Sequence, residues 1–243
     1  MVRIKAFPVN PLGENTVLLW KEGGRACVVI DPGMLRGRET TVVMDFLSAE
    51  GLSPAAILLT HGHFDHTCGV AALLGNGPLP VYMHPADLPL ARLGVALNPG
   101  LANAAGTLFG TEAERERWLS GIRPAAETAP IEAAGMTFRV IETPGHSPGS
   151  VCYYLEDEHL LFAGDTLFAG SIGRSDLPGG DYDDLIRSIM DKLMGLPGET
   201  DVICGHGPAT SVGREAMTNP FLVPFNEPEP QWEDGDPLPL EGI

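Results

Sequence analysis

Short apolar runs that end in polar, glycine-containing turns recur along this chain. Four such runs lie at residues 26–30, 55–59, 160–163 and 202–204, and residues 137–142 are also strand-like. Apolar runs of this length are typical of buried strands. Amphipathic spacing instead predicts helices at about residues 38–50, 67–74, 181–194 and 212–217. We therefore expect buried strands combined with surface helices.

The run at residues 55–59 leads directly into the densest group of polar side chains. His61, His63, Asp65 and His66 follow it within a single turn. Imidazole and carboxylate groups at this density suit zinc, iron and manganese. The alternative is an ordinary polar turn with a capping aspartate, but three histidines would then be surplus. The sequence therefore predicts a metal site on the loop that leaves this strand.

Three further side chains of the same kind follow other predicted strands. His146, Asp165 and His206 each come shortly after a strand-like segment, and each has a glycine beside it. Glycine allows a sharp turn and a close approach of the backbone to an ion. We expect these strand ends to meet at one rim of a sheet sandwich. His84, before Pro85, is expected outside the site, and His159 is expected in a solvated turn.

These motifs together resemble the metallo-β-lactamase superfamily. The run H-x-H-x-D-H, a distant histidine, the segment Gly-Asp-Thr-Leu-Phe and a final Gly-His carry the resemblance, which extends from Asp31 to His206. It implies an α/β fold, the αβ/βα sandwich of two mixed β-sheets flanked by helices. It also implies two divalent metal ions, zinc first, with iron or manganese as alternatives, and a role for Asp31 in supporting the metal loop. The implied ligands are His61, His63 and His146 for one ion, Asp65, His66 and His206 for the other, and Asp165 as a bridge.

The segment from Asp165 to Asp176 is similar to that of the glyoxalase II group, the hydroxyacylglutathione hydrolases. A basic residue at the position of Arg174 meets the glutathione carboxylate in that group, and a guanidinium can do so with two hydrogen bonds. The alternative role for Arg174 is a salt bridge to Asp176. Only about 37 residues follow His206, too few for the helical domain of the long enzymes. The chain therefore resembles the short, single-domain members, and the thiol half of the substrate stays open.

The resemblance implies hydrolysis of a small-molecule thioester, possible substrates including glutathione derivatives. Two bound metal ions would supply hydroxide at neutral pH, with Asp165 holding both and Asp65 orienting the nucleophile. A persulfide dioxygenase with one Fe(II) on His61, His146 and Asp165 is the first rival. A lactonase using the same seven ligands is the second. β-Lactamase activity is disfavoured because of the aspartate bridge, and a non-catalytic metal protein is disfavoured because no ligand is missing.

Composition limits the partners and the compartment. With 15 basic and 32 acidic residues, the net charge of −17 would repel a polyphosphate, so nucleic acid is an unexpected partner. The sequence shows no signal-peptide pattern and no membrane-spanning segment. The four cysteines form no C-x-x-C pair, which favours a reduced, cytoplasmic protein; they are Cys27, Cys68, Cys152 and Cys204. Cys68 and Cys204 lie near proposed ligands but are expected to be core residues.

The length of 243 residues favours one large domain. We expect this hydrolase domain at residues 1–218, followed by a proline-rich acidic tail at residues 219–243. The irregular segment from Gly94 to Pro130 is interpreted as a lid or pocket wall, with a surface insertion as the alternative.

Overall fold

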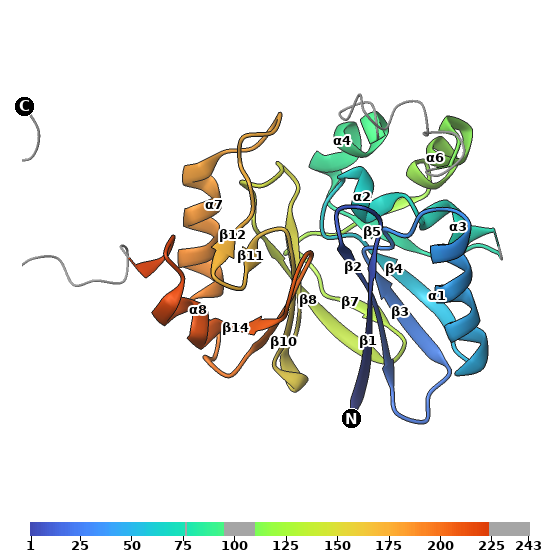
Figure 1. Ribbon diagram of the computed structural model, residues 1–243, viewed down its shortest axis with the longest axis horizontal. Coiled ribbons are helices and arrows are strands. Elements are labelled where there is room, and N and C mark those ends of the chain that lie inside the picture. Colours follow the sequence, from blue (N-terminus) through green and yellow to red (C-terminus); the bar gives the residue numbers. More distant parts are fainter. Residues whose placement is uncertain (76, 95–109, 224–243) are drawn as a thin grey trace, which may run out of the picture.

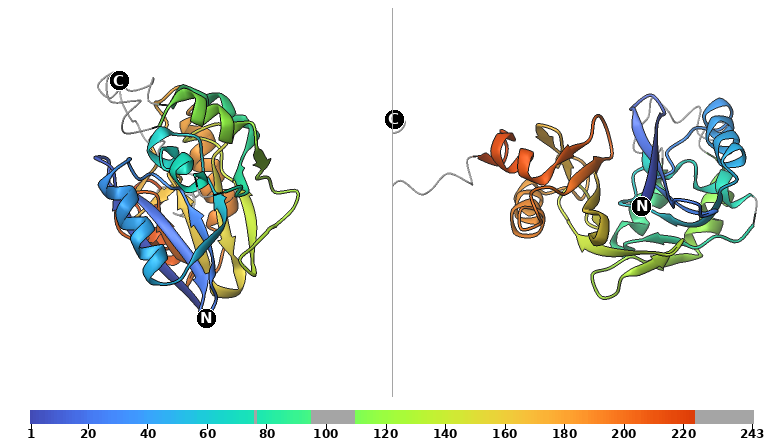
Figure 2. Two further views of the ribbon diagram at one scale, coloured as in Figure 1. Left: turned by 90° about the vertical axis from the view of Figure 1, so that its right-hand side faces the viewer. Right: turned by 90° about the horizontal axis from the view of Figure 1, so that it is seen from below.

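Two six-stranded mixed sheets face each other, and helices cover the outer side of each (Figure 1; Figure 2). The computed structural model describes residues 1–75, 77–94 and 110–223. The first sheet has the order β1 to β6, at Val2–Val9, Glu14–Lys21, Ala26–Ile30, Ser53–Leu58, Val81–Met83 and Ile122–Pro124. The second has the order β14-β13-β10-β9-β8-β7, at Thr210–Ser211, Asp201–Cys204, Leu160–Gly164, Val151–Leu155, Met136–Glu142 and Ile131–Ala133. The expected αβ/βα sandwich is therefore confirmed.

Helices lie outside the sheets and in the loops around one edge. The α-helices are α1 Arg38–Ala49, α2 Phe64–Thr67, α3 Val70–Leu74, α4 Leu88–Leu93, α6 Glu112–Leu119, α7 Tyr182–Ser188 and α8 Val212–Thr218. The described residues also contain two 3-10 turns, η1 Pro85–Asp87 and η4 Glu156–Glu158, and a π-helical turn, η5 Ile189–Leu193. A small hairpin, β11 Leu167–Phe168 with β12 Ser171–Ile172, follows β10.

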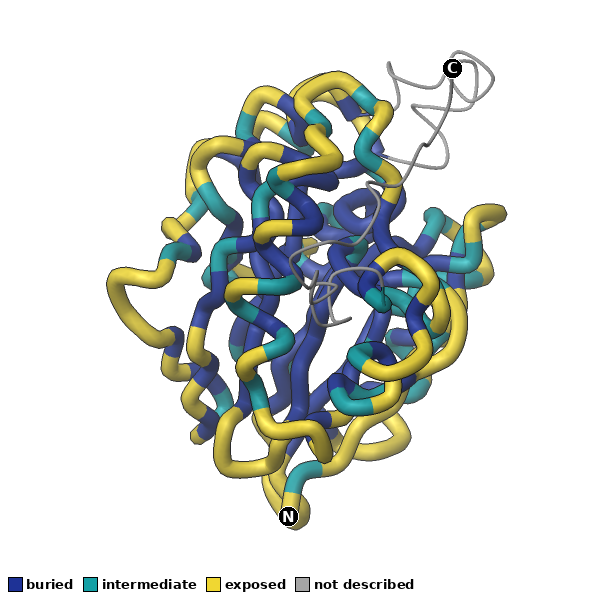
Figure 3. The backbone as a smooth tube through the Cα atoms, turned by 90° about the vertical axis from the view of Figure 1, so that its left-hand side faces the viewer, coloured by how far each residue is buried: buried dark blue, intermediate teal, exposed yellow. Residues whose placement is uncertain are grey.

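Alternating side chains of the strands pack into two different layers of the core. In β2, Val17 and Leu19 belong to the cluster shared by both sheets, whereas Leu18 and Trp20 pack in the cluster that includes α1 and α3. Successive side chains of a strand point to opposite faces, so a strand between two layers must be apolar on both. The inner strands are accordingly the buried part of the molecule (Figure 3).

Strand direction brings the polar strand ends together. β3, β4 and β5 are parallel neighbours, so the segments that follow them leave one edge of the first sheet. In the second sheet β10 is parallel to β13, and β8 and β10 are both antiparallel to β9. β8, β10 and β13 therefore also point the same way. The ligand-type side chains follow these strands directly.

Two expected helices differ in detail from the structure. The stretch at residues 67–74 forms two short helices, α2 and α3, with Gly69 between them donating its N–H to the carbonyl of Pro32 (2.7 Å). The stretch at residues 181–194 begins as α7 and continues as the π-helical turn. The other two helices, α1 and α8, lie where they were expected.

The segments left open by the sequence are described only in part. Of the stretch from Gly94 to Pro130, residues 95–109 lie outside the described residues, and the rest contains α6 and the edge strand β6. Of the expected tail, Asn219 and Leu222 are fully buried, and residues 224–243 lie outside the described part. The lid and the domain boundary at residue 218 therefore stay predictions. No helix among the described residues is long and apolar enough to cross a membrane.

Candidate metal centre

The loop after β4 is fixed by a buried carboxylate at the end of β3. Asp31 accepts two hydrogen bonds from Thr60, one from the backbone N–H to Oδ1 (2.7 Å) and one from the hydroxyl to Oδ2 (2.6 Å). The same Oδ2 accepts a hydrogen bond from Nδ1 of His66 (3.0 Å). Asp31 thus supports both ends of the His61–His66 turn, as the resemblance implied.

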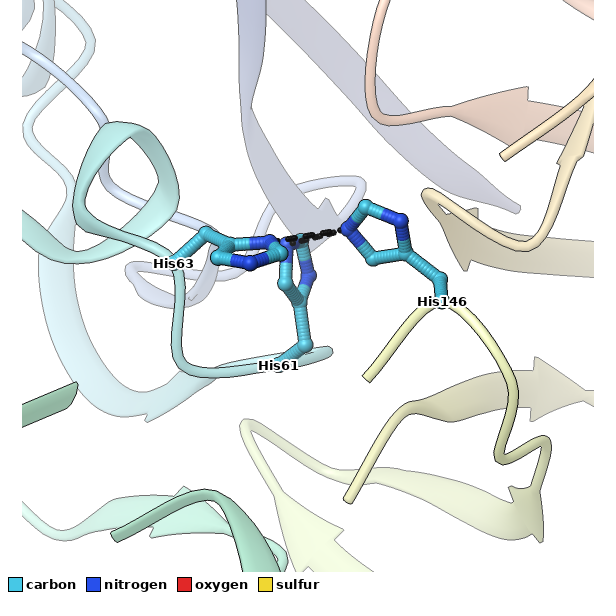
Figure 4. A group of neighbouring side chains, drawn as sticks. All are labelled: His61, His63 and His146. Atoms are coloured by element: carbon cyan, nitrogen blue, oxygen red, sulfur yellow. Dashed lines mark hydrogen bonds between the residues drawn. The ribbon is translucent and has the colours of Figure 1, made fainter. Parts of the chain in front are cut away.

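Three histidines form the first group (Figure 4). His61 and His63 come from the loop after β4, and His146 comes from the loop after β8 in the other sheet. Nε2 of His146 lies 2.8 Å from Nδ1 of His63 and 3.3 Å from Nε2 of His61. Two nitrogen ligands about 2.1 Å from a tetrahedral zinc ion are themselves about 3.4 Å apart. The His61–His146 distance matches this spacing and the His63–His146 distance is shorter, so the three nitrogens converge as ligands of one ion would.

Asp65, His66 and His206 form the second group. Nε2 of His206 lies 3.2 Å from Nε2 of His66 and 3.4 Å from Oδ2 of Asp65. Helix α2 carries Asp65 and His66, and the loop after β13 carries His206. Each group therefore combines side chains from both sheets.

The outward nitrogens of four of these histidines face acceptors. Nδ1 of His146 donates to the carbonyl of Arg174 (2.7 Å), and Nδ1 of His206 donates to the carbonyl of Leu12 (3.0 Å). Nδ1 of His66 faces Asp31, and Nδ1 of His61 lies 3.0 Å from the Thr60 hydroxyl. A proton held on Nδ1 leaves the lone pair of Nε2 directed into the centre, which is the arrangement of metal-binding imidazoles.

Asp165 lies between the two groups. Its Oδ1 is 3.4 Å from Nε2 of His66, and its Oδ2 is 3.6 Å from Nε2 of His146 and 3.5 Å from Nε2 of His206. Oδ1 is buried and accepts no hydrogen bond of ordinary geometry from the described residues. A buried carboxylate oxygen without a donor is costly unless a cation satisfies it. The donor set thus fits a pair of divalent cations that share this carboxylate.

The electrostatics differ between the two groups. Burial lowers the pKa of His61 well below its ordinary value and lowers the pKa of His63 to about 4, so these imidazoles are neutral at pH 7. Burial also opposes charge on His66, but the Asp165 and Asp65 carboxylates outweigh it and raise the pKa of His66. Burial alone would raise the pKa of Asp165, but the surrounding histidines, His66 first, outweigh it and keep that pKa below its ordinary value. The three-histidine group therefore offers neutral nitrogens, whereas a metal ion at the second group would have to displace the proton that the carboxylates hold on His66.

Arg174 touches the centre through its backbone rather than its side chain. Its guanidinium forms two hydrogen bonds to Asp176, each 2.8 Å long, and is 60% exposed. This is the salt bridge that the sequence offered as the alternative. The contact of Arg174 with a substrate carboxylate stays a prediction.

The remaining candidates of the sequence analysis lie outside the two groups. The thiol of Cys68 donates to the carbonyl of Gly33 (2.9 Å), and Cys204 is buried at the end of β13. Nε2 of His84 lies 3.6 Å from Glu142, and His159 is exposed at the end of a turn.

Two buried acids beside the centre were not among the residues expected from the sequence. Glu14 is fully buried, with Oε1 4.0 Å from Nδ1 of His66. Asp87 is also fully buried, and it follows β5 much as His61 follows β4. Asp87 follows a short apolar strand but has no adjacent glycine, whereas Glu14 has Gly13 beside it but begins β2 instead of following a strand. Neither acid therefore carries the full pattern that marked the other positions.

Comparison with known proteins connects this centre to one family. The sequence model of the family described as Metallo-beta-lactamase superfamily matches residues 9–206. This range includes all seven side chains of the two groups and their bridge. The chain is 32% identical over 224 residues to the protein named hydroxyacylglutathione hydrolase GloC from Haemophilus influenzae. That match covers 91% of this chain and 98% of the relative.

Two solved structures are similar over almost their whole length. The BLEG-1 B3 metallo-beta-lactamase has a TM-score of 0.72 at 37% identity, with 91% of this chain and 100% of that chain covered. TTHA1623, solved in a di-iron-bound form, has a TM-score of 0.71 at 41% identity, with 90% and 100% covered.

Proposed function

Since the chain belongs to the metallo-β-lactamase superfamily of metallo-hydrolases, we propose that it hydrolyses thioesters of the hydroxyacylglutathione type. The position of Asp165 carries this proposal. One carboxylate within 3.6 Å of histidines from both groups, with a buried oxygen that lacks a donor, favours a binuclear centre.

The ligand assignment follows the two groups. We assign one ion to His61, His63 and His146, the other to Asp65, His66 and His206, and the bridge to Asp165. Zinc is the first choice for a set of imidazoles and carboxylates, and iron is the second because a similar structure holds two irons. When bound, two divalent cations supply Lewis acidity that activates water at neutral pH and polarises the substrate carbonyl.

The side chains of the centre suit a thioester. Asp65 lies within the second group, with its Oδ2 3.8 Å from Nε2 of His66 and 3.4 Å from that of His206. Its carboxylate would there orient the attacking water by accepting a hydrogen bond from it. A thiolate leaves without first taking a proton, so the centre needs no separate general acid. No side chain of the centre is therefore required to act as a general acid.

Support for the substrate class comes from a relative and from Arg174. The name of the relative GloC gives hydroxyacylglutathione hydrolysis as that protein's activity. Here the carbonyl of Arg174 accepts a hydrogen bond from His146, so the Arg174 side chain is attached to the backbone at the border of the centre. Its position suits contact with the carboxylate of a thiol such as glutathione. We propose the cytoplasm as the compartment, because all four cysteines are buried free thiols.

β-Lactam hydrolysis is a second candidate because of one observation. The chain is 37% identical over its near-full length to a structure named as a B3 metallo-beta-lactamase. A β-lactam is also an acyl compound that a metal-activated water can open. The two substrates differ in the leaving group, which is an amine in the β-lactam and a thiolate in the thioester.

The test is an assay of purified protein, loaded with zinc or iron, against a lactoylglutathione-type thioester without oxygen. We expect thiol release that depends on added metal and stops with a chelator. A chromogenic β-lactam, and glutathione persulfide with oxygen, are assayed in parallel. Oxygen consumption with the persulfide, and no anaerobic thioester cleavage, would replace the hydrolase with a dioxygenase.

A further inference from the structure

We propose that Asp87 is a positioning residue for the three-histidine group, because its carboxylate holds together the two loops that carry His61, His63 and His146. The inference rests on the proposed function only for the assignment of these histidines as ligands. Asp87 ends the 3-10 turn η1 that follows β5.

Both carboxylate oxygens of Asp87 accept hydrogen bonds from the two loops. Oδ2 accepts the backbone N–H of Gly62 (2.8 Å), which lies between His61 and His63. The same oxygen accepts the hydroxyl of Ser147 (2.7 Å), the residue after His146. Oδ1 accepts the backbone N–H of Gly149 (2.6 Å). One side chain therefore fixes the backbone next to all three histidines.

The packing leaves no room for another arrangement. Asp87 is fully buried. A Cβ on Gly62 would lie 2.8 Å from the backbone oxygen of Asp87, and a Cβ on Gly149 would lie 2.8 Å from its backbone nitrogen. Real Cβ atoms do not approach polar backbone atoms this closely, so both glycines serve the close approach of the loops to Asp87.

Only the carboxylate satisfies this set of donors. Three donors point at two oxygens, and an asparagine amide would turn its own N–H groups toward at least one of them. Alanine would leave the buried N–H groups of Gly62 and Gly149 without this acceptor. The loops would stay connected elsewhere, because the N–H of Val151 donates to the carbonyl of Thr60 (2.8 Å). Loss of Asp87 should therefore loosen the histidines without separating the sheets.

The second group is supported by different contacts. His66 is held by Asp31 and His206 by the carbonyl of Leu12. Among the described residues, Asp87 makes no hydrogen bond to α2, which carries Asp65 and His66, or to the loop that carries His206. Removal of the Asp87 carboxylate should therefore weaken the binding of one metal ion and leave the binding of the other unchanged. Partners next to metal ligands typically change metal affinity by roughly 10- to 100-fold.

Zinc affinity measured by competition with a chromophoric chelator tests the inference. Asp87→Asn and Asp87→Ala are each compared with the unchanged protein. We expect one of two zinc equivalents to bind roughly 10- to 100-fold more weakly, with the other unchanged. Glu215→Gln is the matched control, since Glu215 is also fully buried and accepts hydrogen bonds from Gly170, Thr210 and Asn219 away from the three-histidine loops. It should lower the melting temperature and leave both zinc affinities unchanged.

Two backgrounds assign the loss to one group. With His206→Ala, the remaining zinc is held by the three histidines, and Asp87→Asn should weaken it. With His61→Ala, the remaining zinc is held by the second group, and Asp87→Asn should leave it alone. Equal affinities in all Asp87 variants, or equal losses in both backgrounds, would overturn the inference and leave Asp87 a purely structural residue. Thioester hydrolysis by the unchanged protein is measured separately, so failure of the proposed function is distinguishable from failure of this inference.

Discussion

Arg174 shows how one residue can serve the centre in two separate ways. Its carbonyl accepts the Nδ1 hydrogen of His146, which any amino acid at this position could provide. Its guanidinium is exposed and paired with Asp176. Substitution of the side chain should therefore leave the metal centre intact and report on substrate contact alone.

Arg174→Ala should raise KM for the thioester several-fold and change kcat little, which is the signature of lost uniform binding. Steady-state kinetics with a glutathione thioester measures both constants. Arg187→Ala is the control, because Arg187 is another exposed arginine, paired with Asp184 on α7. An unchanged KM together with a lower melting temperature would show that the salt bridge is the only role of the Arg174 side chain.

His63 gives the metal-free protein a defined pH dependence. Its pKa is lowered to about 4 by burial, whereas an unfolded histidine titrates near pH 6.5. Between these values the unfolded state binds the extra proton, so the contribution of His63 to stability rises with pH and is complete above pH 6.5. Below pH 4 both states are protonated, and the dependence ends.

Chemical unfolding of metal-free protein and of His63→Gln tests this dependence. The difference in unfolding free energy between the two proteins should change from about pH 4 to pH 6.5, in favour of the unchanged protein at higher pH. It should then stay constant up to pH 8. A difference that does not vary with pH across this window would show that His63 is not held neutral by burial.

Among strands and helices, buried apolar runs were the most predictable feature. The runs that became β3, β4, β10 and β13 are apolar because both faces are covered, and this leaves a direct mark on the sequence. The edge strand β6 was missed, because Ile122–Pro124 is short and largely exposed. The break between α2 and α3 was missed because Gly69 packs against Met34, a contact set by tertiary structure.

Gly145, next to His146, is a position where we expect no residue other than glycine to fit without distorting the loop. Its φ of +135° disfavours other residues, and a Cβ there would lie 2.2 Å from the backbone nitrogen of Leu185 on α7. Gly145→Ala must therefore move α7 or the His146 loop. We expect a loss of about 2–4 kcal/mol in unfolding free energy, together with weaker metal binding.

Gly23→Ala is the matched control for Gly145→Ala. Gly23 also has a positive φ, +74°, but a Cβ there meets nothing within 4 Å. Backbone strain alone should cost about 1 kcal/mol, with metal binding unchanged. Urea unfolding and zinc titration of both variants give the comparison. Equal losses in the two would mean that the contact with α7 does not constrain the His146 loop.

The sandwich as a unit creates the centre, because each ligand group takes side chains from both sheets. The dense group at His61–His66 and the recurrence of ligand-type residues after strands predicted that these seven side chains would lie together, which the structure shows. Their role as metal ligands stays a prediction. Asp87 and Glu14 were not predictable, since their roles depend on contacts between loops distant in sequence. Buried carboxylates of this kind have no sequence pattern of their own.

The proposed centre needs both halves of the sandwich and the carboxylate between them. Asp165→Ala should reduce bound metal from two equivalents to at most one, and His206→Ala should remove the ion of the second group. Both should lower anaerobic thioester hydrolysis by orders of magnitude. Asp184→Ala, which removes an exposed carboxylate on α7, should keep both metals and full turnover.

Metal content measured beside oxygen-free thioester hydrolysis, on the same samples of the unchanged protein and of Asp165→Ala, is the most direct test. We predict two equivalents of metal and rapid hydrolysis in the unchanged protein, but at most one equivalent of metal and hydrolysis lower by orders of magnitude in Asp165→Ala. An Asp165→Ala protein that retains two metal ions and full turnover would contradict the bridge and the binuclear mechanism built on it.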